Sequence, residues 1–274
     1  PGDAHDVFES IKAELLGTTE TLYVAGQDGV HSHPIPPTSG SWSTTLKTAL
    51  EMAEAAEPAK DFSGYVIYCK QLEVSYAIEG WQWCQWQANG GSNAPAINTD
   101  TYVGVAHTRD NWTTIEYSET VLHLAADASW YNFCGAHGLG VWQHDNCREL
   151  YCSVAIMHDY SGGAHADELC CHRLYKSTDR GKNWLQVDQV DKDVYGAPAA
   201  TGPNQGAVFM PWTSNLTEKY VYWTAENSSR NMVLRRSING GLTFAELHEW
   251  STASTADTAQ DITGTINRND TVEI

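Results

Sequence analysis

Basic residues are scarce in this 274-residue sequence. It has 16 Lys and Arg against 34 Asp and Glu, which gives a formal net charge of −18 at pH 7. A surface that binds nucleic-acid phosphates or an anionic membrane needs clustered cations, which so few Lys and Arg do not favour. Long apolar runs are also missing, and none approaches the ~18–20 residues of a membrane-spanning helix. We therefore expect no nucleic-acid partner and no membrane insertion.

Several familiar catalytic and nucleotide-binding motifs are absent as well. The sequence has no G-x-S-x-G, no H-E-x-x-H, no G-x-x-x-x-G-K-[ST] and no G-x-G-x-x-G element. Aromatic residues, in contrast, are plentiful, with 11 Trp and 13 Tyr in a composition that is 42% hydrophobic. This composition supplies enough apolar surface for a folded core and argues against a disordered chain.

Most of the chain has the pattern of short strands. Segments such as TLYVAG, GYVIYCK, TYVGVAHT and KYVYWTA are rich in β-branched and aromatic residues and are bounded by turn residues. Two segments predict helices. Residues 6–16 place apolar side chains at helical spacing before Gly17, and residues 44–57 are good helix formers that precede Pro58. A strand pair is the alternative for 44–57, because this stretch resembles residues 113–127.

The strongest pattern is an internal repeat. Residues 177–187 (STDRGKNWLQV) and residues 237–247 (SINGGLTFAEL) align without gaps as S-x-[DN]-x-G-x-x-[WF]-x-x-[VL]. A shortened copy, TRDNWTTI, stands at 108–115, and a more degenerate copy, TSGSWSTTL, stands at 38–46. The anchoring aromatic residues are spaced 70, 72 and 60 residues apart, at Trp42, Trp112, Trp184 and Phe244.

The two full copies resemble the Asp-box, or BNR repeat, of sialidase-like β-propellers, where the motif closes a hairpin at the edge of a blade. The residue types explain why such a turn is stable. An Asp or Asn side chain accepts hydrogen bonds from its own turn, glycine supplies a positive φ, and the ring packs on the sheet. The box residues are Ser177, Asp179, Gly181, Trp184, Ser237, Asn239, Gly241 and Phe244, with Asp110 and Trp112 in the shortened copy.

We therefore predict an all-β fold, a β-propeller of four to six blades with Asp-box hairpins and a short N-terminal helical arm. The arm is residues 1–19 and the propeller is residues 20–274. In the family, the box turns lie at the end of the blade away from the usual ligand site. Similar short, box-bearing propellers occur in bacteriophage tail and other virion proteins.

One segment concentrates residues of the metal-ligand type. In CGAHGLGVWQHDNC, four residues have the mirror-symmetric spacing C-x2-H-x6-H-x2-C: Cys134, His137, His144 and Cys147. Four such ligands across a hairpin would suit a structural Zn2+ site. Two other interpretations are open, namely a Cys134–Cys147 disulfide and free thiols. The chain has seven cysteines, so at least one is free or pairs between chains.

A second segment, GWQWCQWQANGG, concentrates tryptophan. Trp81 and Trp83 share one face of the predicted strand, because side chains alternate along a strand, and Trp86 follows. Exposed rings beside glutamines would stack on the faces of sugars, which makes these three residues candidate glycan-binding residues. The alternative is burial of the rings between blades.

The arginines argue against sialidase activity. The resemblance implies three arginines that clamp a carboxylate, a Tyr–Glu pair and an acidic general acid. Arg109 and Arg180 lie inside box turns, and none of the other six arginines stands in the Phe/Tyr-Arg-Ile-Pro setting of the family.

We therefore predict a non-catalytic binding or structural module rather than an enzyme. Its expected setting is extracellular or on a virion surface, and its expected partners are a surface glycan or other subunits of an assembly. The alternative is a glycoside hydrolase with an axial carboxylate site.

Overall fold

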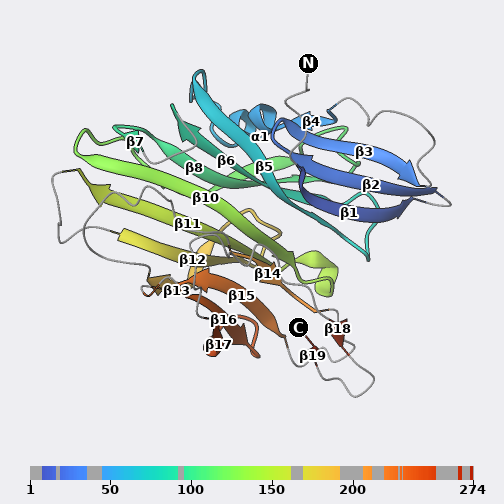
Figure 1. Cartoon of the computed structure of the whole chain (residues 1–274). Coiled ribbons are helices and arrows are strands. Elements are labelled where there is room, and N and C mark those ends of the chain that lie inside the picture. The colour runs from blue at the N-terminus through green and yellow to red at the C-terminus, as the bar shows by residue number, and fades with distance from the viewer. Residues whose placement is uncertain are drawn as a thin grey trace.

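The computed structural model describes residues 8–16, 19–35, 45–91, 96–161, 169–191, 206–211, 219–227, 229, 231–250, 265–266 and 272–273. Within them, four antiparallel sheets follow one another along the chain (Figure 1). The first sheet contains β1 (Phe8–Leu16), β2 (Thr19–Gly26), β3 (Gly29–Ile35) and β4 (Lys47–Thr48). The second contains β5 (Tyr65–Val74), β6 (Gln82–Gly90), β8 (Thr101–Thr108) and β9 (Tyr117–Leu124).

The third sheet contains β10 (Trp130–Val141), β11 (Leu150–Tyr160), β12 (Leu169–Ser177) and β13 (Leu185–Asp191), with the short β7 (Ala96–Ile97) beside β10. The fourth contains β14 (Val208–Phe209), β15 (Val221–Glu226), β16 (Met232–Ser237) and β17 (Ala245–Trp250). A small separate pair joins β18 (Thr265–Ile266) to β19 (Val272–Glu273). The helix α1 spans Ala49–Ala56, and the 3-10 turn η1 spans Asp145–Cys147.

Each sheet has the strand order of a propeller blade. The first strands of successive sheets contact one another, β1 with β5, β5 with β10, and β10 with β14. Separate apolar clusters fill the space between the first and second sheets, the second and third, and the third and fourth. The predicted all-β propeller is confirmed, and the four sheets fall within the predicted range of four to six blades.

The box turns connect the third and fourth strands of the second, third and fourth sheets, and all three make the same hydrogen bonds. The first-position hydroxyl accepts from two backbone N–H groups and donates to the third-position side chain. In the third sheet, Ser177 Oγ accepts from Gly181 N at 2.8 Å and donates to Asp179 Oδ1 at 2.8 Å. Ser237 repeats these bonds with Gly241 and Asn239, each at 2.8 Å. The two full boxes predicted from sequence therefore form as expected.

The shortened copy forms the same turn with a different assignment of residues. Thr108 takes the first position, and its Oγ1 accepts from Trp112 N at 3.1 Å. Trp112 therefore occupies the glycine position, with φ 65°, and its indole is buried. The anchoring position falls to Ile115, which packs against the cluster between the first two sheets. The assignment of Trp112 as the anchoring aromatic is thus wrong, and the degenerate copy at 38–46 lies mostly outside the described residues.

The two helix predictions have opposite outcomes. Residues 8–16 form strand β1, which pairs with β2, so a helical arm is wrong here and the first sheet crosses the predicted boundary at 19/20. Strand pairing with the adjacent segment overrides the helical spacing of the apolar residues. The second helix is confirmed over Ala49–Ala56 as α1. Its capping box joins Thr48 and Glu51, so the alternative of a strand pair is not observed there.

Among the described residues, no helix has both the length and the apolar character needed to cross a membrane.

Candidate functional site

The connection between β5 and β6 brings Trp81 to the same end of the second sheet as its box turn. Gln82 pairs with Thr108, and Asn111 N donates to Gly80 O at 3.3 Å. The predicted tryptophan segment therefore meets the predicted box turn. The box turn of the third sheet also lies here, because Arg180 Cζ is 5.2 Å from the Trp81 ring.

Four aromatic rings lie together at this junction. The Trp83 and His107 rings stack at 4.6 Å with an interplanar angle of 17°, and the Trp81 ring meets His107 edge-on at 5.3 Å. Tyr117 follows, with its ring centroid 5.0 Å from that of His107. Trp81 is only partly buried, whereas Trp83 and His107 are fully buried. Trp81 therefore presents the outer part of the cluster to solvent.

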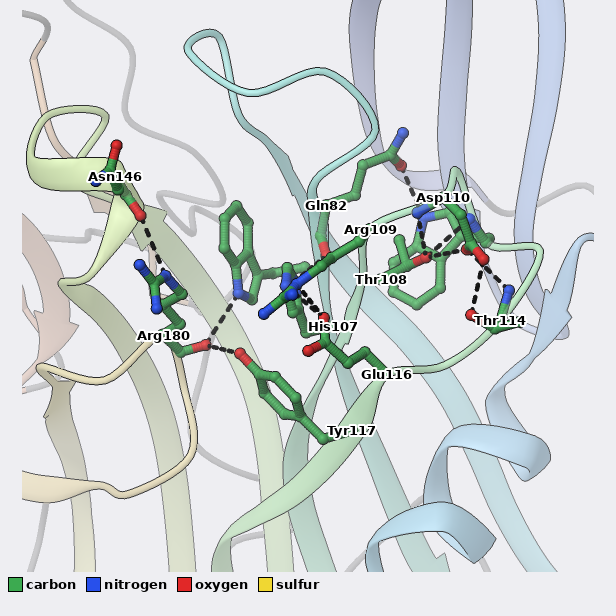
Figure 2. A network of polar contacts seen from close by, with 12 residues as sticks. Gln82, His107, Thr108, Arg109, Asp110, Thr114, Glu116, Tyr117, Asn146 and Arg180 are labelled. Carbon is green, nitrogen blue, oxygen red and sulfur yellow. Dashed lines mark hydrogen bonds and ion pairs between the residues drawn. The ribbon is translucent and has the colours of Figure 1, made fainter.

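Three cations surround these rings. Arg180 is the first. Arg109 Cζ is 4.8 Å from the Trp81 ring centroid, and Lys182 Nζ is 5.1 Å from the Tyr117 ring centroid. Arg109 forms an ion pair with Glu116 (Figure 2). Cations held against aromatic faces are favoured by the ring quadrupole. We call these eight residues the Trp81 cluster: Trp81, Trp83, His107, Arg109, Glu116, Tyr117, Arg180 and Lys182.

The ionisable rings of the cluster stay neutral at pH 7. Burial, together with the nearby Arg109, Arg180 and Lys182, lowers the pKa of His107 to about 4. Its Nδ1 donates to the carbonyl of Gln82 at 2.9 Å, because a carbonyl can only accept. Burial raises the pKa of Tyr117, whose hydroxyl donates to the carbonyl of Arg180 at 2.6 Å (Figure 2). The charges of the cluster are therefore those of the arginines, Lys182 and Glu116.

The backbone that carries Arg180 is held in a costly conformation. Arg180 has φ 68°, and the neighbouring turn η1 has three successive residues at φ 53°, 55° and 53°. A non-glycine residue in this left-handed region costs about 1–2 kcal/mol. Arg180 Nε donates to Asn146 O in η1 at 3.3 Å (Figure 2). Arg180 N donates to Arg148 O at 2.9 Å. Surrounding contacts thus fix both the turn and the arginine.

The three predicted glycan-binding tryptophans have different positions. Trp81 and Trp83 share a face and touch, as predicted, with ring centroids 6.3 Å apart. Trp83 and Trp86 are fully buried, so the prediction that their rings stack on a sugar is wrong. Trp83 Nε1 donates to Arg180 O at 3.0 Å, and Trp86 Nε1 donates to Ser118 Oγ at 2.9 Å. Only Trp81 of the three stays a candidate.

The predicted zinc ligands are not brought together. Cys134 and His137 lie on β10, whereas His144 and Cys147 lie at η1 in the connection from β10 to β11 and not on the opposing strand. Cys134 Sγ accepts from Thr101 Oγ1 at 3.1 Å, whereas Cys147 Sγ lies 3.3 Å from Ser75 Oγ. Both the His/Cys zinc site and the alternative Cys134–Cys147 disulfide are therefore wrong. None of the seven cysteines forms a disulfide, and the described residues contain no group of three or more His, Cys, Asp or Glu arranged to hold a metal.

A second polar cluster, at the opposite end of the second sheet, was not predicted. Asp100 forms an ion pair with Lys60 and accepts from Ala126 N at 2.7 Å. Tyr65 OH donates to it at 3.3 Å, and His123 Nε2 lies 3.3 Å away. Despite desolvation, these partners lower the pKa of Asp100 to about 2. The cluster joins residues up to 66 positions apart in sequence, so no local sequence motif predicts it.

The described carboxyl groups with raised pKa values lie elsewhere. Burial raises the pKa of Glu14, but both its oxygens accept hydrogen bonds at 2.7 Å, from Gly80 N and Gln82 Nε2. Burial also raises the pKa of Glu119, which lies on β9, the fourth strand of its sheet. Neither carboxyl makes a contact with Asp100 that would form an acid–base pair.

No family model matches the sequence, and no curated protein sequence matches it either. Solved structures show a distant similarity of fold. A Hadza microbial sialidase is 11% identical with a TM-score of 0.48, and the match covers 85% of this chain and 45% of that one. An α-L-arabinofuranosidase from Fusarium graminearum is 13% identical with a TM-score of 0.45, covering 88% and 66%. An α-L-arabinanase from Penicillium chrysogenum is 12% identical with a TM-score of 0.47, covering 99% and 76%.

This chain spans between about half and two thirds of the length of the first two of these structures. At such low identity, the similarity concerns the fold and assigns no residue of this chain a role. The chain is thus distantly similar in structure to β-propeller glycoside hydrolases of the sialidase and arabinofuranosidase kind.

Proposed function

We propose that this protein is a non-catalytic carbohydrate-binding β-propeller and that the Trp81 cluster is its binding surface. One observation carries the proposal: the partly exposed Trp81 indole is fixed beside two guanidinium groups, at 4.8 and 5.2 Å from its ring. An indole face packs against the C–H face of a sugar ring, and guanidinium groups donate to its oxygen atoms.

The arrangement also supports binding rather than hydrolysis. The carboxylate of the cluster, Glu116, is paired with Arg109, and His107 is neutral and buried. Hydrolysis by two carboxyl groups requires one acid that stays protonated near neutral pH. The cluster offers rigid aromatic and cationic contacts but no such acid. Its position at the box end of the blades also differs from the axial site of a propeller enzyme.

The binding surface is tested with Trp81→Ala in the full chain. A glycan array followed by calorimetric titration of the best ligand measures the effect. We expect the wild type to bind and the variant to lose about tenfold in affinity, which corresponds to about 1.4 kcal/mol of lost contact. Trp250→Ala is the matched control, because Trp250 is 43% exposed on β17 in the fourth sheet. Binding that survives Trp81→Ala unchanged would contradict the proposal.

Glycoside hydrolysis is the second candidate, and the Asp100 cluster favours it. Asp100 is ionised and lies with Tyr65 and His123 at the end of the sheet opposite the box turn. A chromogenic glycosidase screen separates the two functions. We expect no turnover, because the four groups around Asp100 already satisfy its oxygens. Turnover that Asp100→Asn abolishes in a folded protein would replace the binding proposal with the hydrolase.

A further inference from the structure

We infer that the carbohydrate bound by the Trp81 cluster is anionic and carries carboxylate groups, as a uronic-acid oligosaccharide does. This inference rests on the proposed function and names its ligand class. The starting observation is one of charge. Arg109, Arg180 and Lys182 converge on the cluster, although the whole protein has a formal net charge of −18.

The electrostatic effect of these cations is visible on the ring that they surround. All three lower the pKa of His107, so their combined field disfavours a further positive charge there. Acids offset two of the three cations, since Glu116 pairs with Arg109 and Glu119 interacts electrostatically with Lys182. Arg180 forms no ion pair within the described residues, so a negatively charged ligand gains most from this cation.

Arg180 is the cation best placed to receive the ligand. Its side-chain hydrogen bond within the described residues goes to a backbone carbonyl, that of Asn146, and not to a carboxylate. A guanidinium has five N–H donors in one plane, and this geometry matches the two oxygens of a carboxylate. Because the Arg180 guanidinium lies over the Trp81 ring, 5.2 Å from its centroid, a carboxylate that meets the guanidinium places the rest of the sugar against the exposed part of the indole.

The position of Arg180 is fixed before any ligand arrives. Its carbonyl accepts from Trp83 Nε1 at 3.0 Å and from Tyr117 OH at 2.6 Å, and its own N–H donates to Arg148 O. A pre-organised cation loses less conformational entropy on binding than a mobile one. The left-handed backbone at Arg180 is maintained by these contacts, which a purely structural turn would achieve with glycine at lower cost.

Removing the charge of Glu116 should have the opposite effect on affinity to removing the charge of Arg180. It neutralises Arg109, whose side chain is 49% exposed, and a ligand carboxylate competes with it for that guanidinium. Glu116→Gln removes the competing charge while keeping the side-chain shape. It should therefore strengthen binding of an anionic sugar, whereas a cluster with only a structural role would show no gain in affinity.

The experiment compares two probes that have the same sugar chain, one with charged carboxylates and one with neutral methyl esters. Tetragalacturonate and its fully methyl-esterified form are titrated against the full chain at low and moderate salt. We expect the acid form to bind at least about tenfold more tightly and to weaken as salt rises, because salt screens exposed charges. Arg180→Gln should abolish this preference, because the affinity for the acid form falls much further than the affinity for the ester. Arg236→Gln on β16 is the control, with the preference expected to remain.

The outcomes separate the two proposals. Equal binding of acid and ester, with both dependent on Trp81, overturns the anionic ligand and leaves carbohydrate binding intact. Failure of both probes and of every glycan on the array overturns the proposed function itself. Polyglutamate is a third probe. If it binds as tightly as tetragalacturonate, the cluster recognises charge without sugar, and the inference of a uronate ligand is wrong.

Discussion

At the scale of single residues, burial sets the charge of the site. His107 lies between aromatic rings with its Nδ1 bonded to a carbonyl, so it folds as the neutral imidazole. Its pKa falls from 6.5 to about 4 in the folded chain. Asp100 shows the opposite case, an acid whose partners overcome desolvation and keep it ionised down to about pH 2.

The pH dependence of stability follows from His107. Its folded-state pKa is depressed, so the unfolded chain takes up the proton first as pH falls below 6.5, and stability declines towards pH 4. The contribution is on the order of 3 kcal/mol at most, and Glu116 reduces it by favouring the protonated ring. Urea denaturation at several pH values, compared between wild type and His107→Gln, measures it. The variant should have a flatter pH profile between pH 7 and 4, and parallel profiles would contradict the assignment.

At the scale of elements, the box turn depends on its first hydroxyl more than on its glycine. Trp112 stands where glycine does in the other two boxes, and the same hydrogen bonds form around Thr108. A hydroxyl side chain at the first position is thus the feature that all three box turns share. This is why the pattern of Ser, Asp and aromatic residues predicted two turns correctly and misassigned the aromatic residue in the third.

Ser177→Ala tests this requirement. It removes the acceptor of the Asp179 and Gly181 N–H groups, leaves a buried donor unpaired, and should cost about 1–3 kcal/mol in the free energy of unfolding. Ser177→Thr is the matched control, because Thr108 makes the same bonds in the second sheet. Chemical denaturation measures both, and an equal loss in the two variants would show that packing, not the hydroxyl, stabilises the turn.

At the scale of the whole molecule, the boxes of the third and fourth sheets also join their sheets to the preceding ones. The carbonyl of Arg180 accepts from Trp83 and Tyr117 of the second sheet. The carbonyl of Gly240 in the fourth sheet likewise accepts from Tyr151 OH at 2.8 Å and Lys176 Nζ at 2.7 Å in the third. The left-handed residue of the box thus turns its carbonyl towards the neighbouring blade.

Tyr117→Phe and Tyr151→Phe each remove one of two donors at these carbonyls. We expect each to cost about 1 kcal/mol and their effects to add, because they act at different junctions. Tyr151→Phe combined with Lys176→Met should exceed the sum of its parts, since it leaves the Gly240 carbonyl without either donor. Thermal and urea unfolding provide the free energies. A strictly additive result for the second pair would argue against a shared acceptor.

The fold could be predicted from the sequence because the box is a local motif, but the arrangement of residues in the Trp81 cluster could not. Trp81, Arg109 and Arg180 come from two sheets, and only strand register and the packing of one blade on the next bring them together. The helix predicted over 6–16 failed for a related reason, because β1 is defined by pairing with β2. The zinc prediction failed because Ile156 lies opposite Cys134 in the β10–β11 hairpin, whereas His144 and Cys147 lie in the connecting turn. Contact with other subunits of an assembly stays a prediction.

The hydrogen bonds at two junctions make the third sheet a self-contained structural unit. With its box, it carries an acceptor for the sheet before it, at Arg180, and donors for the sheet after it, at Tyr151 and Lys176. An in-frame duplication of such a segment would bring its own connectors and leave no buried carbonyl unmatched at the new boundary. Lengthening by whole blades is therefore compatible with the chemistry of the junctions, whereas insertion of a partial blade is not.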